Sequence, residues 1–375
     1  MRAPRNAVLL ALALVALLAL LGSGFITHAP NRLVSGTPFT LWNAPGGWRA
    51  GLILTLAVAL AAGAFLTPAR HHSATIVATA SLLLLLLLDT AGVAARDFAA
   101  HAPPAARAGL GAAFWVASLS TALAIIDALQ RARANPALRF AVALALAAAI
   151  LALAADGRLD GLSLAREYDV RRSAFAAELL RHCALVAGSV FPALVIGVPL
   201  GIFAARKPRS RGGLFAVLNV IETVPSVALF GLLIAPLAAL GLSGVGPAPA
   251  IVALTLYALL PVARNTEAGI LAADTAAVEA ARGMGMTTGQ IFRRVELPLG
   301  LPVFVAGLRI VVVQTIGLAA VAALIGAGGL GTFIFQGIGQ YAIDLVLLGA
   351  VPTIALALAA DFALAMMTPR MGQEP

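Results

Sequence analysis

The sequence predicts an all-α integral membrane protein with about ten transmembrane helices. Its composition is 61% hydrophobic and 11% charged with a mean hydropathy of +0.99, whereas soluble domains are roughly 45–50% apolar and roughly 25% charged. The apolar residues also gather in ten separate runs, each close to the roughly 20 residues that a helix needs to cross a bilayer. Short gaps rich in arginine separate these runs.

The ten runs divide into two groups of five. The first group covers approximately Ala7–Ile26, Trp48–Leu66, Ser73–Ala95, Ala108–Leu129 and Phe140–Ala155. The second group covers approximately Ala184–Ala205, Leu214–Leu240, Pro247–Val262, Leu301–Ile325 and Leu345–Met367. The first run resembles a signal peptide, but it is long and no good small-residue cleavage site follows it, so we expect an uncleaved span.

The basic residues predict the orientation of the chain. If the N-terminus lies in the cytoplasm, the gaps on that side hold more arginine than the gaps on the other side, as the positive-inside rule requires. Both termini are therefore expected to be cytoplasmic. The net charge of +9 is explained by this orientation and by contact with membrane lipid, and we expect no nucleic-acid partner.

The sequence lacks the residues of several enzyme classes. Its single lysine, Lys207, has no glycine-rich loop before it and no Ser or Thr after it, so the phosphate-binding Walker A motif is missing. Cys183 is its one cysteine, which excludes an intrachain disulfide or a cysteine-cluster metal site. We expect no catalytic residues and no metal site, and conclude that the chain is not an enzyme.

The segment 156–183 divides the chain. It is polar and rich in both acidic and basic residues, and the spans after it contain glycine and proline, whereas those before it are leucine-rich. We predict a membrane module of about five helices over 1–155, a periplasmic connection with an amphipathic helix over 156–183, and a second membrane module over 184–375. The second module contains a cytoplasmic loop over 264–300, which is too polar to cross the membrane.

Local signals divide this loop into two short helices. Asp274 or Thr275 can cap the first helix, and Gly285 is expected to end it. Thr287 with Gln290 three residues later predicts a capping box for the second helix, which we expect to stop before Pro298.

This loop resembles the EAA loop found in permeases of type I ABC importers. The residues that match its pattern at the right spacing are Glu279, Ala280, Ala281, Gly285, Leu297 and Pro298, and Val295 stands where isoleucine is usual. The resemblance implies that the C-terminal five helices form a type I ABC importer permease core, and that the loop is a coupling helix held in a cleft of a cytoplasmic ATPase. The alternative is an amphipathic loop that lies on the membrane surface.

Three further segments resemble the permeases of glycine betaine, carnitine, choline and proline osmoprotectant importers. They are Glu222–Leu229, Leu259–Thr266 and Gly326–Gly331, and the extra N-terminal helices resemble a longer branch of that family. The resemblance implies a location in the bacterial inner membrane, a periplasmic substrate-binding protein, a second permease subunit that is identical or paralogous, and ATPase subunits that use ATP and magnesium. No cofactor is expected on this chain.

Two other functions remain as alternatives: an ABC importer permease for another small solute, such as an amino acid, and a secondary transporter. A secondary transporter would show inverted repeats and several paired charges inside the membrane, and neither is apparent in the sequence.

A few polar or helix-breaking residues lie inside the predicted spans. Glu222, Pro225 and Ser226 either line a translocation path or serve packing. Arg309 can pair with an acid such as Glu222 or Asp361, or its side chain can extend toward the cytoplasmic surface. We favour extension toward the surface.

Overall fold

The computed structural model describes residues 4–32, 34, 36–66 and 70–367. The outer ends of the two predicted modules, 1–3 and 368–375, lie outside the described residues. The chain forms two compact units, Met1–Val170 with Gln340–Asp344, and Arg171–Gly339 with Leu345–Pro375.

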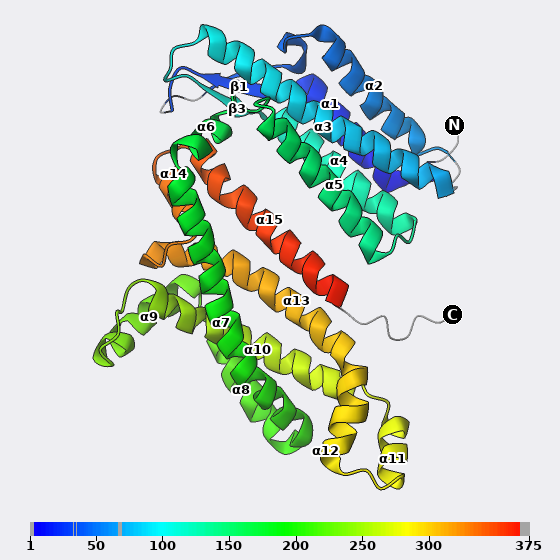
Figure 1. The fold of residues 1–375 in the computed structure, drawn as a ribbon, viewed down its shortest axis with the longest axis vertical. Coiled ribbons are helices and arrows are strands. Elements are labelled where there is room, and N and C mark those ends of the chain that lie inside the picture. Colours follow the sequence, from blue (N-terminus) through cyan, green and yellow to red (C-terminus); the bar gives the residue numbers. More distant parts are fainter. Residues whose placement is uncertain (1–3, 33, 35, 67–69, 368–375) are drawn as a thin grey trace. The chain divides into compact units, whose positions relative to one another are not determined.

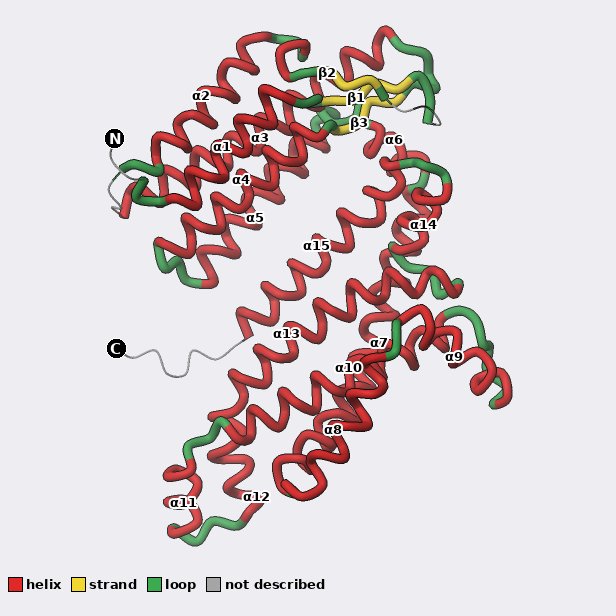
Figure 2. The backbone as a smooth tube through the Cα atoms, turned by 180° about the vertical axis from the view of Figure 1, so that it is seen from behind, coloured by secondary structure: helices red, strands yellow, loops and turns green. Residues whose placement is uncertain are grey.

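Unit 1 is a helical bundle with a small sheet at one end (Figures 1 and 2). Its helices are α1 (Ala7–Gly22), α2 (Gly47–Gly63), α3 (Arg70–His101), α4 (Ala112–Arg131), α5 (Pro136–Ala155) and α6 (Ser163–Val170), with a 3₁₀ turn at Leu41–Asn43. The core of the bundle is made of small and aliphatic side chains at helical spacing, as in the α1 series Leu9, Ala13, Ala16 and Leu20. In contrast, α5 buries none of its side chains within the chain.

The sheet of unit 1 was not predicted from the sequence. Strands β1 (Ile26–Ala29), β2 (Thr37–Phe39) and β3 (Arg107–Leu110) pair antiparallel in the order β2-β1-β3. The register places His28 opposite Thr37 on one side and opposite Ala108 on the other. The first predicted span therefore ends at Gly22 rather than Ile26, because the residues after it hydrogen-bond across strands.

Unit 2 is built around α7 (Arg172–Arg206), α10 (Pro247–Leu271) and α13 (Leu297–Val321). The other elements are α8 (Pro208–Thr223), α9 (Ser226–Ala239), α11 (Thr275–Gly283), α12 (Thr288–Ile291), a π-helical segment (Phe292–Glu296), a 3₁₀ turn (Ala322–Ile325), α14 (Gly331–Gly339) and α15 (Ile343–Met367). Helix α10 packs between α7 and α13. Glycines permit this close packing, since a Cβ on Gly201 would lie 2.4 Å from the Ala263 oxygen and one on Gly300 would lie 2.1 Å from the Gly269 oxygen.

The predicted fold class is confirmed as a helical membrane protein, but the count of ten spans is not. Seven helices in the described part of the chain are long and apolar enough to cross a membrane, or eight if the bent pair α8 and α9 is one span. Helices α1 and α2 have only 16 and 17 residues, which is near the lower limit for a span.

Two helices extend past the predicted module and loop boundaries. Residues 172–183, assigned to the connection, form the first third of α7, and residues 264–271, assigned to the cytoplasmic loop, form the end of α10. The polar side chains in the second stretch have partners within the fold. Thr266 donates to the Val262 carbonyl at 2.8 Å, and Glu267 pairs with Arg211 at 2.7 Å.

Candidate functional site

Helix α11 lies at one end of unit 2, beyond the ends of α10 and α13 (Figure 1). It begins after Asp274, whose Oδ1 accepts a hydrogen bond from the Ala276 N–H at 3.0 Å. It ends at Gly283, and Gly285 follows with φ = +79°, a left-handed conformation that favours glycine. Both sequence predictions for this helix, the Asp274 cap and the glycine stop, are confirmed.

The outer face of α11 carries small side chains and two charged ones, Glu279 and Arg282. Glu279 and Ala280 are exposed, whereas Ala281 is 1% exposed and packs inward. A Cβ placed on Gly283 or Gly285 would meet nothing within 4 Å. A partner surface can therefore approach the backbone of this helix closely near Gly283 and Gly285, with Glu279 and Arg282 as the charged groups on the same face.

The second half of the loop begins with the predicted capping box. The Gln290 N–H donates to Thr287 Oγ1 at 3.4 Å, and the Thr287 N–H donates to Gln290 Oε1 at 2.9 Å. The helix does not stop before Pro298, however. It continues through the π-helical segment into α13, so that the prediction of a stop was wrong.

The π-helical segment explains why Pro298 is tolerated. Pro298 lies in the first turn of α13, at the point where the hydrogen-bond pattern changes from π to α, so that its missing N–H interrupts no regular ladder. Leu297, just before it, is 45% exposed. The matching residues thus occupy two places: α11 carries Glu279, Ala280 and Ala281, and the start of α13 carries Leu297 and Pro298.

Two ion pairs tie this end of unit 2 together, and sequence reasoning missed both. Arg206, the last residue of α7, donates to both carboxylate oxygens of Glu296, with one N–O distance of 2.9 Å. Arg211 of α8 pairs with Glu267 of α10. Both acids are buried, with side chains 5% and 4% exposed. The positive-inside rule predicted only that these arginines lie on the cytoplasmic side, and it does not indicate which acids they pair with.

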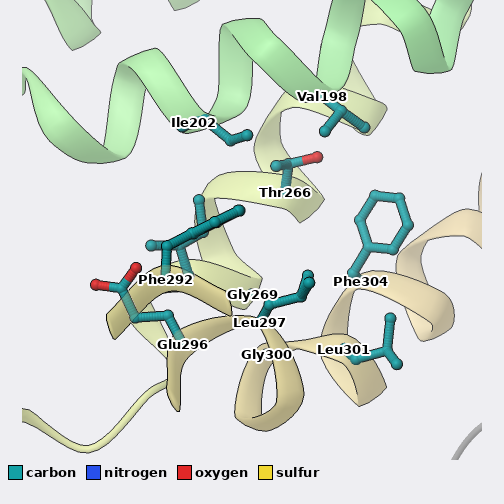
Figure 3. A pocket seen from close by; sticks show the side chains of 11 residues that line it. Val198, Ile202, Thr266, Gly269, Phe292, Glu296, Leu297, Gly300, Leu301 and Phe304 are labelled. Atoms are coloured by element: carbon teal, nitrogen blue, oxygen red, sulfur yellow. The ribbon is translucent and has the colours of Figure 1, made fainter. Parts of the chain in front are cut away.

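An apolar cavity of about 110 Å³ lies beside the Glu296 ion pair (Figure 3). Ile202 of α7, Thr266 of α10, and Phe292 and Phe304 from either side of the start of α13 surround it. The space lies where α7, α10 and the π-helical segment meet. Small rearrangements at this junction therefore cost little packing.

The candidate translocation residues lie where α8 and α9 meet at a bend of 101°. Helix α8 ends at Thr223 and α9 begins at Ser226, with Pro225 as its N-cap. The Tyr257 hydroxyl of α10 donates to the Val224 carbonyl between the two helices. The predicted interruption is therefore a sharp break.

The polar side chains at the break point away from the packed core of the chain. Glu222 and Pro225 are exposed and Ser226 is half-buried. Arg309 does not extend to the surface as we favoured. It forms a bidentate pair with Asp361 of α15, with N–O distances of 2.9 and 2.8 Å.

Two polar side chains of α7 form hydrogen bonds at this end of unit 2, Glu178 to the glycine-rich segment and His182 to α13. Gly328 and Gly329 have φ of +78° and +84°, and Glu178 accepts a hydrogen bond from the Gly329 N–H. His182, fully buried, donates from Nε2 to the Ile316 carbonyl at 3.1 Å. The segment lies at the opposite end of α13 from α11, about 37 Å away at 1.5 Å per residue.

Comparison with known proteins gives two family matches that divide the chain. Residues 4–165 match the family described as the N-terminal domain of the ABC transporter permease YehY. Residues 197–373 match the family described as the inner membrane component of binding-protein-dependent transport systems.

Curated relatives match the second half of the chain. The carnitine transport permease protein OpuCB of Listeria monocytogenes is 41% identical over 51% of this chain and 85% of its own length. The glycine betaine/carnitine/choline permease protein OpuCD of Bacillus subtilis is 42% identical over 49% of this chain and 78% of its own length. The osmoprotectant import permease protein OsmW of Salmonella typhimurium is 41% identical over 52% and 92%.

A solved structure of the MetNI methionine ABC transporter in inward-facing conformations aligns with a TM-score of 0.48 and 28% identity, over 52% of this chain and 96% of the other.

The alignments with the three permease proteins named above cover most of the length of each of them, at about 40% identity. The chain therefore belongs to the family of inner membrane components of binding-protein-dependent transport systems, the permease subunits of type I ABC importers, and groups with the permeases of osmoprotectant importers.

Proposed function

We propose that this chain forms the membrane path of an ATP-driven importer for small osmoprotectants such as glycine betaine, carnitine or choline. The curated relatives at about 40% identity are named for transport of these compounds. A periplasmic binding protein delivers the solute, and a second permease subunit, identical or paralogous, completes the path. ATP and magnesium are used by a cytoplasmic ATPase subunit.

The observation that carries this proposal is the exposed surface of α11. The helix is fixed by the Asp274 cap before it and by the capping box after it, and its outer face offers small side chains with two charged ones, Glu279 and Arg282. Movement of an ATPase cleft around such a helix would be transmitted to α13, because α11 is followed directly by α12 and the π-helical segment, which continues into α13. The Glu296 ion pair extends this connection to α7.

The translocation path is proposed to run past the break between α8 and α9. Glu222, exposed on α8, can attract a cationic head group, and the Ser226 N–H in the first turn of α9 can donate a hydrogen bond to the carboxylate of a polar solute. Both chemistries suit a zwitterion such as glycine betaine.

Replacement of Gly285 by glutamate tests the ATPase contact. Gly285→Glu places bulk and negative charge in the open space beside α11, and should abolish co-purification with the ATPase and uptake of labelled glycine betaine and choline. Gly285→Ala carries the same positive-φ strain without the bulk, and Gly212→Glu adds the same charge at an open site on α8. Both controls should retain association and uptake. Normal association and uptake in Gly285→Glu would contradict the contact.

The Arg309–Asp361 pair also suits a secondary transporter, since paired charges inside a membrane often belong to ion pathways. A measurement of osmoprotectant uptake in cells whose ATPase lacks its phosphate-binding lysine separates the two functions. We expect no uptake in these cells. Uptake that persists there and follows a proton or sodium gradient would favour the secondary transporter.

A further inference from the structure

Unit 1 contains a cavity at its sheet-bearing end, and none of the residues proposed for ATPase contact or translocation lines it. The cavity has two adjoining lobes of about 280 and 400 Å³. Both lobes are bounded by the same four residues, His28 and Phe39 of the sheet and Phe98 and His101 of α3. All of these residues lie within unit 1.

Three rings form the wall that the lobes share. The His28 ring stacks on Phe98 with centroids 3.8 Å apart and planes at 10°, and it lies 4.2 Å from the Phe39 ring. The strand register explains the second contact. His28 is opposite Thr37, and Phe39, two residues further along β2, is its diagonal neighbour on the same face.

The cavity carries one acidic group beside this wall. Asp97, on α3 next to Phe98, lines the smaller lobe and is exposed to it. The titratable groups that line the two lobes are Asp97, His28 and His101. Burial lowers the pKa of His28, and this effect is larger than the opposing attraction of Asp97. His28 is therefore neutral at pH 7, and the negative charge of Asp97 is not cancelled by it.

The remaining polar groups at the wall are uncharged, so none of them offsets the repulsion between Asp97 and an anion. His28 Nε2 is buried and has no hydrogen-bond partner, and His101 Nδ1 already lies 2.9 Å from the Asp97 carbonyl of its own helix. Thr40 and Asn43 line the smaller lobe from the sheet side. An anion would meet Asp97, whereas a cation would meet the carboxylate and the negative faces of the rings.

We propose that this ring-lined cavity binds a small organic cation, with its cationic group against the wall of Phe39, His28 and Phe98 and with Asp97 as the counter-charge. A quaternary ammonium group fits best, since it has no N–H to satisfy and is attracted by aromatic faces. This site lies in the N-terminal module, outside the permease core. It follows from the chemistry of the cavity and does not depend on the solute that the importer carries.

The test is a binding measurement on the purified full chain in lipid nanodiscs at pH 7.5. Calorimetric titration with choline is compared with 3,3-dimethylbutan-1-ol, which has the same shape but no charge. Choline should bind at least tenfold more tightly than the alcohol, because the alcohol gains neither the carboxylate nor the cation–π attraction. Equal binding of the two would overturn the proposal.

Variants assign the binding to this cavity. Asp97→Asn and Phe98→Leu should each weaken choline binding by about tenfold, a change typical of one lost partly desolvated interaction. The matched controls are Asp156→Asn, an acid 70% exposed on the surface, and Phe65→Leu, an exposed ring at the end of α2. Both should bind choline within about twofold of the unaltered chain.

Two outcomes separate this site from other choline sites and from misfolding. Choline held by the translocation path would bind equally in Asp97→Asn, so an unchanged affinity in that variant refutes the proposal. If Phe98→Leu does not fold, Asp97→Asn still decides, because its side chain is exposed. Uptake of osmoprotectants without binding in this cavity would contradict this inference alone, and binding without any uptake would contradict the proposed function alone.

Discussion

The ion pair between Arg206 and Glu296 allows a sharp test of what stabilises the end of unit 2 that carries α11. The Glu296 side chain is 5% exposed and that of Arg206 is 37% exposed. Removal of one partner of a fully buried pair costs about 3–5 kcal/mol, because the other charge is left without compensation. Since water reaches Arg206, we expect about 2–3 kcal/mol of destabilisation for Arg206→Ala.

The double variant isolates the pair itself. In Arg206→Ala with Glu296→Gln, no buried charge remains, so the second substitution should restore about 1–2 kcal/mol of the loss. Arg206 also lies over the Phe292 ring at 5.9 Å, a contact worth about 0.5 kcal/mol at an exposed site. That part of the loss is expected to persist in the double variant.

The assay is equilibrium unfolding of the purified chain in mixed micelles at increasing denaturing detergent. Arg209→Ala is the matched control, because Arg209 is an exposed arginine at the start of the next helix, α8. It should change the free energy of unfolding by less than about 0.5 kcal/mol. A double-mutant cycle with a coupling energy below about 0.5 kcal/mol would refute the reasoning, since the ion pair would then contribute nothing measurable to the stability of the chain.

Three further predictions concern other parts of the molecule. Tyr257→Phe removes the hydroxyl that donates to the Val224 carbonyl, and should lower stability by about 1 kcal/mol and weaken uptake; unchanged thermal stability and uptake would show that the break is held by other contacts. Asp361→Asn leaves Arg309 without its bidentate partner, and should cost about 2 kcal/mol in micelle unfolding, with the loss reduced in Arg309→Met/Asp361→Leu; a larger loss in the double variant would contradict this. Because the pKa of His28 is lowered from 6.5 in the folded chain, the unfolded chain binds its proton first, so stability should fall as pH drops below about 6.5. His28→Gln should flatten that part of the pH profile of thermal unfolding, and an unchanged slope would assign it to other groups.

Local signals predicted the loop well and its continuation badly. The Asp274 cap and the Thr287–Gln290 capping box were correct, because each depends on hydrogen bonds within three residues. The stop before Pro298 was wrong because proline disfavours a helix only where the α-helical ladder is regular. The π-helical segment before it changes that ladder.

The translocation residues show the same limit. Proline and serine in an apolar run indicated an interruption, but the run gave no angle and no partner. The bend of 101° and the contact with Tyr257, 33 residues away, come from the packing of α10 against the break. The roles of Glu222, Pro225 and Ser226 remain predictions.

Sequence by itself determined the membrane character of this protein, its family and the position of the loop that carries Glu279, because apolar runs, capping residues and motif spacing are all local properties of the chain. The tertiary structure alone decided which charges meet. Arg206 finds Glu296 across 90 residues and Arg309 finds Asp361 across 52, since each contact depends on how helices pack rather than on any residue near it in the chain. The ring wall of His28, Phe39 and Phe98 arises in the same way, from a sheet that joins segments distant in the sequence.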